Sequence, residues 1–259
     1  MKRVLLKILK RLFGLTVVGL FITLAYCSVL RQMETPSYDE IIADTNVSQS
    51  SSLKDAAIVS RQSAVKVMSL NPETMNISGA SGTYVTLDDR YFILTVAHGL
   101  KTDCDFVRIV LDKGMGLENH RECHKIIEVD VFSDYAIIEV EKINDLSPVH
   151  ILSKRLTRDD WIHTLAPLTN LVYTGYPNDL GPVTIGGKVM GYSVENHIFM
   201  HSYGWAGASG SGVFNTDGQL VGHVMAILMG ETAHGISVLE DVVVVVPLFK
   251  IDWSVVYHR

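Results

Sequence analysis

Three residues of the sequence have the types and local settings needed to cleave an acyl bond. His98 ends an apolar segment at residues 94–97, and Asp134 immediately precedes another. Ser209 lies in a glycine-rich segment. A serine hydroxyl is a weak nucleophile at neutral pH and needs a nearby base, and histidine suits this role because its pKa is about 6.5. A carboxylate on the other ring nitrogen fixes the tautomer and stabilises the imidazolium. We therefore interpret His98 as base, Asp134 as its orienting acid and Ser209 as nucleophile.

In this chain order the segments resemble the His, Asp and Ser boxes of the chymotrypsin-like (trypsin-fold) serine proteases. The boxes are Leu94-Thr95-Val96-Ala97-His98-Gly99, Ser133-Asp134-Tyr135-Ala136-Ile137-Ile138 and Gly207-Ala208-Ser209-Gly210-Ser211-Gly212-Val213-Phe214. The third box is most similar to that of the bacterial glutamyl endopeptidases. The resemblance covers residues 64–253. It implies two six-stranded antiparallel β-barrels and endopeptidase activity through an acyl-enzyme intermediate, without a cofactor.

The resemblance also implies roles for the backbone around the nucleophile. The N–H groups of Gly207 and Ser209 correspond to the family's oxyanion hole, in which one donor contributes about 2.7–4 kcal/mol of transition-state stabilisation. Ala208 stands where digestive members carry an Asp that pairs with a freshly cut N-terminus, so that zymogen switch is not expected. Ser211 is the rival nucleophile, but the family pattern places the reactive serine first.

Three residues are candidates for a specificity pocket. The trypsin-like preference for Lys/Arg corresponds to an Asp six positions before the nucleophile. In this sequence that position is Tyr203, so the sequence offers no basis for such a preference. His223 lies one position earlier than the pocket histidine of glutamyl endopeptidases. A one-residue shift turns a strand side chain to the opposite face, so a structural role is its main alternative. His201 is the third candidate.

The segments that must position these residues are β-rich. Short runs of Val, Ile, Thr and Tyr alternate with turn residues, and no long helical pattern intervenes, which predicts an antiparallel sandwich or barrel. A short amphipathic helix is expected over residues 248–256. The predicted strands cover residues 64–68, 82–87, 91–96, 106–111, 125–131, 135–140, 171–174, 184–192, 197–201, 213–214, 220–227 and 236–246.

The N-terminal region predicts a membrane anchor. Residues 1–11 are basic, and residues 12–30 contain no charged side chain. At about 1.5 Å per residue a helix of that length spans a hydrocarbon core of about 30 Å. The flanking charges place the N-terminus in the cytoplasm and the following domain outside, in the periplasm or the extracellular space. A cleaved signal peptide and a buried core helix are the alternatives.

The remaining chain divides into two parts. Residues 31–60 are polar and indicate a spacer, with one short helix around residues 53–59. Residues 61–259 form the predicted protease domain, with lobes at about 61–150 and 165–246.

Cysteine content and charge limit the partners. Cys104 and Cys123 are free thiols by default, or one disulfide if the domain lies outside the cytosol. With His120 and His124 they fit no standard zinc spacing, so we expect no metal. The net charge of −6, without a Lys/Arg cluster beyond the N-terminus, argues against nucleic acid.

The sequence leaves three functions in competition. The leading hypothesis is a membrane-tethered serine endopeptidase that acts on protein or peptide substrates. The main alternative is a catalytically silent or gated protease-fold module that binds a partner, although a pure binder has no chemical need for all three boxes. The third is a membrane-tethered chaperone or sensor controlled by peptide binding. Oligomeric state is not predicted.

Overall fold

The computed structural model describes residues 51–100, 102–111, 119–151, 164–177, 180–232 and 235–258. The predicted anchor at residues 12–30 and most of the predicted spacer lie outside these ranges. Among the described residues, no helix combines the length and apolarity needed to cross a bilayer. The chain from Ser48 to Arg259 is one compact unit.

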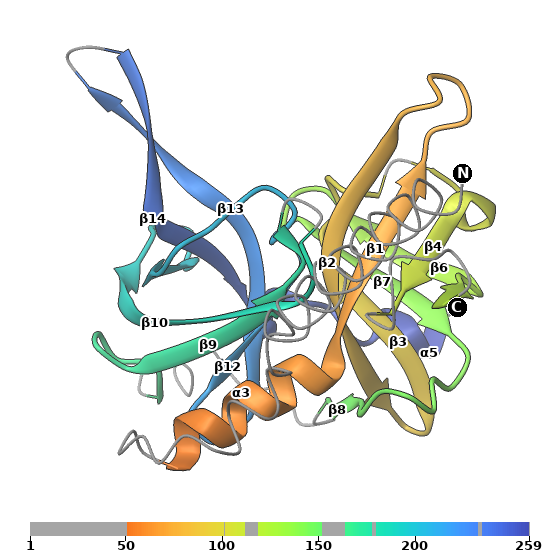
Figure 1. The fold of residues 1–259 in the computed structure, drawn as a ribbon, viewed down its shortest axis with the longest axis horizontal. Coiled ribbons are helices and arrows are strands. Elements are labelled where there is room, and N and C mark those ends of the chain that lie inside the picture. Colours follow the sequence, from red (N-terminus) through yellow and green to blue (C-terminus); the bar gives the residue numbers. More distant parts are fainter. Residues whose placement is uncertain are drawn as a thin grey trace, which may run out of the picture. The chain divides into compact units, whose positions relative to one another are not determined.

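The first lobe is a sheet in which seven strands follow the order β5-β4-β1-β2-β3-β7-β6 (Figure 1). Neighbours along this path are antiparallel, and β8 joins β2 in parallel. The strands are β1 (Ala64–Leu70), β2 (Ile77–Leu87), β3 (Arg90–Thr95), β4 (Val107–Val110), β5 (His120–Glu122), β6 (Lys125–Asp130), β7 (Tyr135–Val140) and β8 (Val149–His150).

This sheet corrects the expectation of two closed six-stranded barrels. The chain over residues 120–130 changes partner midway, because β5 pairs with β4 while β6 pairs with β7. The two ends of the sheet are therefore joined by the covalent chain at Cys123 and His124, and no strand pairing closes the ring in the described part of this lobe. Since β5 is only three residues long, it offers little backbone for such a pairing.

The second lobe is the expected closed six-stranded barrel. Its strands follow the order β10-β11-β14-β13-β12-β9 and return to the first. Strands β13 and β14 continue past the barrel as a long hairpin, at the upper left of Figure 1. The strands are β9 (Asn170–Gly175), β10 (Val183–Tyr192), β11 (Ile198–His201), β12 (Gly212–Asn215), β13 (Leu220–Thr232) and β14 (Gly235–Pro247).

A helix precedes β1 and belongs to the folded domain. Helix α3 (Ser51–Ser63) runs along the second lobe before the chain enters the first (Figure 1). Its Ala56 and Ala57 are buried in a core shared with Val172 of β9 and Phe214 of β12. The folded domain therefore begins upstream of residue 61, and Ala56 and Ala57 belong to its core rather than to a spacer.

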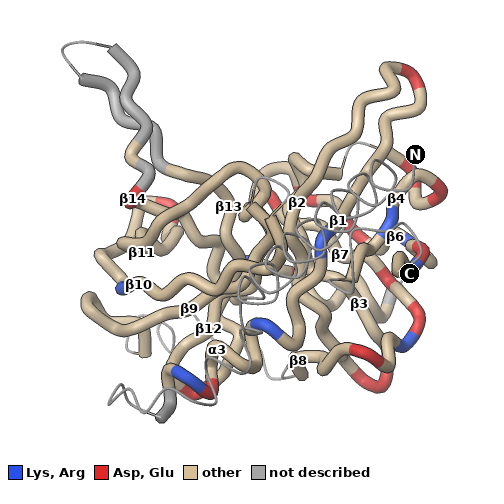
Figure 2. Tube along the Cα trace, in the orientation of Figure 1, with Lys and Arg blue, Asp and Glu red and all other residues tan. Residues whose placement is uncertain are grey.

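The end of the chain is less helical than expected. The predicted helix over residues 248–256 appears as the 3-10 turn η4 (Leu248–Lys250) and the one-turn helix α5 (Val255–His258). Val256 of α5 is buried in the same core as Ala56. Figure 2 shows that most charged positions lie at loops and strand ends.

Replacing Ala56 with aspartate is expected to lower the free energy of unfolding by about 3 kcal/mol or more, because it buries an unpaired carboxylate. Ala56 is fully buried. The matched control, Gln62→Asp, adds the same charge at an exposed position of α3 and should cost less than about 1 kcal/mol. Urea unfolding of the full-length chain measures both. Equal effects of the two substitutions would contradict the burial of α3.

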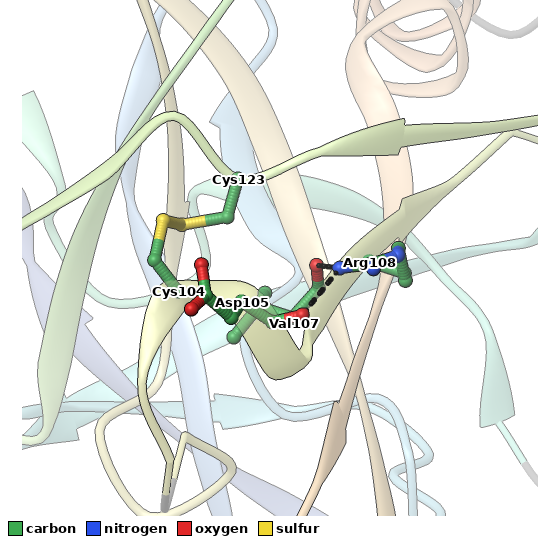
Figure 3. Close-up of a disulfide and its surroundings, with 5 residues drawn as sticks. All are labelled: Cys104, Asp105, Val107, Arg108 and Cys123. Atoms are coloured by element: carbon green, nitrogen blue, oxygen red, sulfur yellow. Dashed lines mark hydrogen bonds between the residues drawn. A yellow bond between two sulfur atoms is a disulfide. The ribbon is translucent and has the colours of Figure 1, made fainter.

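The two cysteines of the first lobe form a disulfide rather than the free thiols taken as the default. Cys104, in the turn η1 (Cys104–Phe106), bonds to Cys123 at the end of β5 (Figure 3). The Arg108 side chain donates hydrogen bonds to the carbonyls of Asp105 and Val107 beside it. The disulfide thus links η1 to the point where the chain changes partner.

Candidate active site

His98 and Asp134 meet through two hydrogen bonds. His98 follows β3, and Asp134 directly precedes the neighbouring strand β7. The Nδ1 of His98 lies 2.8 Å from one carboxylate oxygen of Asp134, and the backbone N–H of His98 donates to the other at 2.9 Å. Burial alone raises the pKa of the Asp134 carboxyl, but the hydrogen bonds from His98 outweigh it and bring that pKa below its ordinary value. The pair therefore holds an ionised carboxylate against Nδ1 and leaves Nε2 for another partner.

The backbone of Asp134 is held in an uncommon conformation. Its φ is +51°, in the left-handed region that aspartate tolerates better than most residues. The carboxylate of Asp130 accepts the N–H groups of Phe132 and Ser133, which fixes the turn leading to Asp134. The carbonyl of Asp134 lies 2.9 Å from Nε2 of His223. These contacts hold the residue so that its side chain faces His98.

His223 holds the backbone of Asp134 through a hydrogen bond to its carbonyl. It is fully buried on β13, and its Nδ1 has no hydrogen-bond partner among the described residues. Burial lowers the pKa of His223 to about 4, although the hydrogen bond to the Asp134 carbonyl opposes this shift. The imidazole is therefore neutral at pH 7, with Nε2–H donating to Asp134. A fully buried side chain in this position favours the structural alternative for His223 over a place in a specificity pocket.

The burial of His223 makes stability depend on pH. The unfolded chain binds a proton at His223 below about pH 6.5, whereas the folded chain does not until about pH 4. Stability is therefore lost as pH falls through this window, by about 3 kcal/mol in total. We expect His223→Gln to flatten that loss. The exposed His150→Gln variant is the control and should follow the wild type. Urea unfolding of the full-length variants from pH 7.5 to 4 tests this, and an unchanged slope in His223→Gln would contradict it.

The loop that carries Ser209 has the backbone shape its glycines permit. A turn closed by the Ala208 N–H to the Trp205 carbonyl has Gly207 at its third position with φ +93°. A type II turn requires such a positive φ there, which glycine adopts without strain. Gly210 has φ +90°, and a Cβ on it would lie 2.0 Å from the carbonyl oxygen of Ser81. The loop therefore approaches the first lobe more closely than any other residue type allows.

Two connections bring the Ser209 loop to His98 and Asp134 across the lobes. In the first, Ser81 of β2 donates its N–H to the Ser209 carbonyl at 2.8 Å and accepts from Thr95 Oγ1, three residues before His98. In the second, His223 holds the Asp134 carbonyl and pairs on β13 with Gly212, three residues after Ser209. Through Ser81 and His223, the segment 209–212 is therefore connected to the elements that carry His98 and Asp134.

Ser209 and Ser211 differ in exposure. Ser209 is partly exposed. Ser211 is fully buried, and its Oγ donates to the Ala208 carbonyl at 2.6 Å. A Cβ on Gly175 would lie 2.1 Å from that Oγ, so the hydroxyl has no room for a substrate carbonyl. Ser209 is therefore the serine of this loop with access to solvent.

The other two pocket candidates are exposed, whereas His223 is buried. Tyr203 is 60% exposed, and its ring stacks on Trp205 with 6.3 Å between centroids. Tyr203 also accepts a hydrogen bond from the Tyr173 hydroxyl through its carbonyl. His201 is exposed at the end of β11, with Nε2 4.0 Å from the Asp241 carboxylate. Tyr203 and Trp205 thus form an exposed aromatic pair in the chain segment that precedes Ser209, and the sequence offered no signal for Trp205.

The residues considered for zinc do not offer the required ligands. Cys104 and Cys123 are bonded to each other, so neither provides a thiolate. Over the described ranges, no three His, Cys, Asp or Glu side chains are grouped to hold a metal ion.

Comparisons with known proteins agree with this architecture. A family model described as the trypsin-like peptidase domain matches residues 80–222, which is more than half of the chain. No curated protein matches the sequence significantly. The active form of the Rv3671c protease from M. tuberculosis aligns with a TM-score of 0.52 and 16% identity, over 74% of this chain and 79% of that one. The serine endoprotease from Yersinia pestis aligns with a TM-score of 0.57 and 19% identity, over 79% and 66%. The likeness of the serine box to glutamyl endopeptidases stays a prediction.

Proposed function

The chain belongs to the trypsin-like peptidase family, and from that premise we propose that it is a serine endopeptidase with His98, Asp134 and Ser209 as its catalytic triad. The main support is the Nδ1 to carboxylate contact of 2.8 Å between His98 and Asp134. This contact commits Nδ1 of a half-exposed histidine and leaves Nε2 to serve as a base. The substrates are proteins or peptides.

In the first step the Oγ of Ser209 attacks the carbonyl carbon of the scissile peptide bond. The Oγ–C bond forms as the hydroxyl proton passes to Nε2 of His98, and Asp134 stabilises the resulting imidazolium through Nδ1–H. The C–N bond then breaks, and His98 returns the proton to the leaving amine. An acyl-enzyme and a free amine remain.

The second step reverses these roles with water. His98 takes a proton from water, whose oxygen attacks the ester carbon, and the proton then returns to Ser209 as the ester bond breaks. In both steps negative charge develops on the carbonyl oxygen of the substrate. The N–H groups of Gly207 and Ser209 are proposed to bind that oxygen, consistent with the turn geometry at Gly207.

Labelling with a fluorophosphonate tests this function directly. The full-length protein in detergent is treated with the probe, and the modified residue is located by peptide mass mapping. We expect modification of Ser209. Modification of Ser211 would show that Ser211, and not Ser209, is the nucleophile. If the folded protein is not labelled at all, the result would favour a catalytically silent or gated binding module.

We further propose that residues 12–30 tether the protease to a membrane, with the protease domain outside the cytoplasm. The Cys104–Cys123 disulfide supports the second part, because disulfides persist in oxidising compartments. Alkaline extraction of membranes tests the tether, and release of the intact chain would contradict it. Thiol labelling of the protein from its native source tests the compartment, since free thiols at Cys104 and Cys123 before reduction would contradict export.

A further inference from the structure

One serine of the first lobe contacts the nucleophile loop at two separate points. Ser81, on β2, is fully buried. Its Oγ donates to the carbonyl of Gly207 at 2.7 Å, and its N–H donates to the carbonyl of Ser209 at 2.8 Å. The same Oγ accepts the N–H of Tyr176, which follows β9, at 2.8 Å. A single residue therefore connects β2 to both ends of the Gly207–Ser209 segment.

These two contacts fall on the residues whose N–H groups are proposed to form the oxyanion hole. The hydrogen bond from Ser81 to the Gly207 carbonyl restricts rotation of the Gly207 backbone, to which the Gly207 N–H belongs. The hydrogen bond from Ser81 to the Ser209 carbonyl restricts the Ser209 backbone in the same way. Ser81, which lies on β2 and outside the loop, therefore sets the orientation of the Gly207 N–H relative to the Ser209 N–H. An oxyanion site needs this because its donors stabilise the transition state only if they are aligned before reaction.

The position of Ser81 is itself well determined. Its carbonyl accepts the hydroxyl of Thr95 at 2.6 Å, and Thr95 is fully buried on β3. On β2, Ser81 pairs with Lys66 of β1. Ser81 is therefore fixed by the first lobe, independently of the loop that it holds.

We propose that Ser81 is a positioning residue for the oxyanion hole: it aligns the N–H groups of Gly207 and Ser209 without touching the substrate. This inference rests on the proposed function. It predicts that losing the Ser81 hydroxyl slows the chemical step while substrate binding and the basicity of His98 are kept.

The central test compares Ser81→Ala with the wild type in fluorophosphonate labelling of the full-length protein. Removing Oγ leaves the Gly207 carbonyl and the Tyr176 N–H buried without that partner. We expect the second-order labelling rate to fall about 100-fold, the lower range for loss of one oxyanion donor. The pH at which labelling is half-maximal should not move, because that midpoint reports the base and not the oxyanion hole.

The matched control is Ser63→Ala. Ser63 is also a fully buried serine whose Oγ donates to backbone carbonyls, but those carbonyls belong to Val59 and Ser60 of α3. Its labelling rate should stay within about threefold of the wild type, since the hydrogen bonds lost lie within α3 and do not reach the Gly207–Ser209 segment. Thermal unfolding of each variant confirms that the folded protein is being compared.

The outcomes separate the two claims. If the wild type is not labelled, the proposed function fails, whatever Ser81 does. If the wild type is labelled and folded Ser81→Ala reacts at the same rate, the inference about Ser81 is overturned alone. A shifted pH midpoint in Ser81→Ala would also overturn it, because the effect would then pass through His98. Should Ser81→Ala not fold, Ser81→Cys decides: its weaker donor should give a rate between those of the wild type and a 100-fold loss, and a wild-type rate would refute the proposal.

Discussion

Ser209→Ala is expected to lower the hydrolysis of dye-labelled casein by the full-length protein by about 10⁶-fold, provided that casein is a substrate of the wild type. The substitution removes the only atom that forms the acyl-enzyme, while His98 and Asp134 stay paired at 2.8 Å. The residual rate then comes from substrate binding and the oxyanion donors alone.

Ser211→Ala is the matched control, because it changes the same residue type two positions away. Ser211 is buried and bonded to the Ala208 carbonyl, so its loss should cost about 1 kcal/mol of stability and at most about tenfold in rate. Comparable losses in the two variants would mean that Ser209 acts through the shape of the loop and not as the nucleophile.

Asp134→Asn should lower kcat by about 10⁴-fold with little change in KM. The amide is nearly the same size as the carboxylate, so the contact with His98 can be kept. If the amide turns its NH₂ group toward Nδ1, the imidazole must carry its proton on Nε2, which is then no longer a base. The carboxylate that stabilises the imidazolium is lost as well.

Steady-state kinetics at pH 8 measure this loss, and the fluorophosphonate labelling rate should fall with kcat. Asp130→Asn is the control: it keeps an oxygen that can accept the N–H groups of Phe132 and Ser133 and does not meet His98. A loss below tenfold in Asp134→Asn would show that His98 does not depend on this carboxylate for its tautomer.

The parts of the fold that the sequence predicted are those with a local signal. Short runs rich in Val, Ile, Thr and Tyr, bounded by turn residues, placed most strands within a few residues of their observed bounds, because residues of these types favour strands. The His98 and Asp134 boxes were recognisable because their sequences resemble those of the family. In the structure they adjoin β3 and β7, which pair with each other.

What the sequence did not predict depends on contacts between distant segments. Ser81 gives no local signal in the run Gly79-Ala80-Ser81-Gly82, since its partner Gly207 is 126 residues away. Helix α3 appeared to be spacer because its sequence is polar apart from a few residues, and two of these are the alanines buried against the second lobe. The first sheet does not close because β5 pairs with β4 whereas β6 pairs with β7. The hydrophobic pattern of residues 120–130 does not show which strands they pair with.

The contacts of Ser81 between the two lobes also bear on when activity appears during refolding and when it is lost on heating. The proposed base, His98, and its carboxylate, Asp134, come from one lobe and the proposed nucleophile, Ser209, from the other, so the proposed site exists only while the two lobes are docked. Each lobe contains a sheet of its own, whereas the placement of Ser209 relative to His98 depends on contacts between the lobes. Activity should therefore appear late in refolding, after both sheets have formed. On heating it should disappear as soon as the interface opens, before the secondary structure of either lobe is lost.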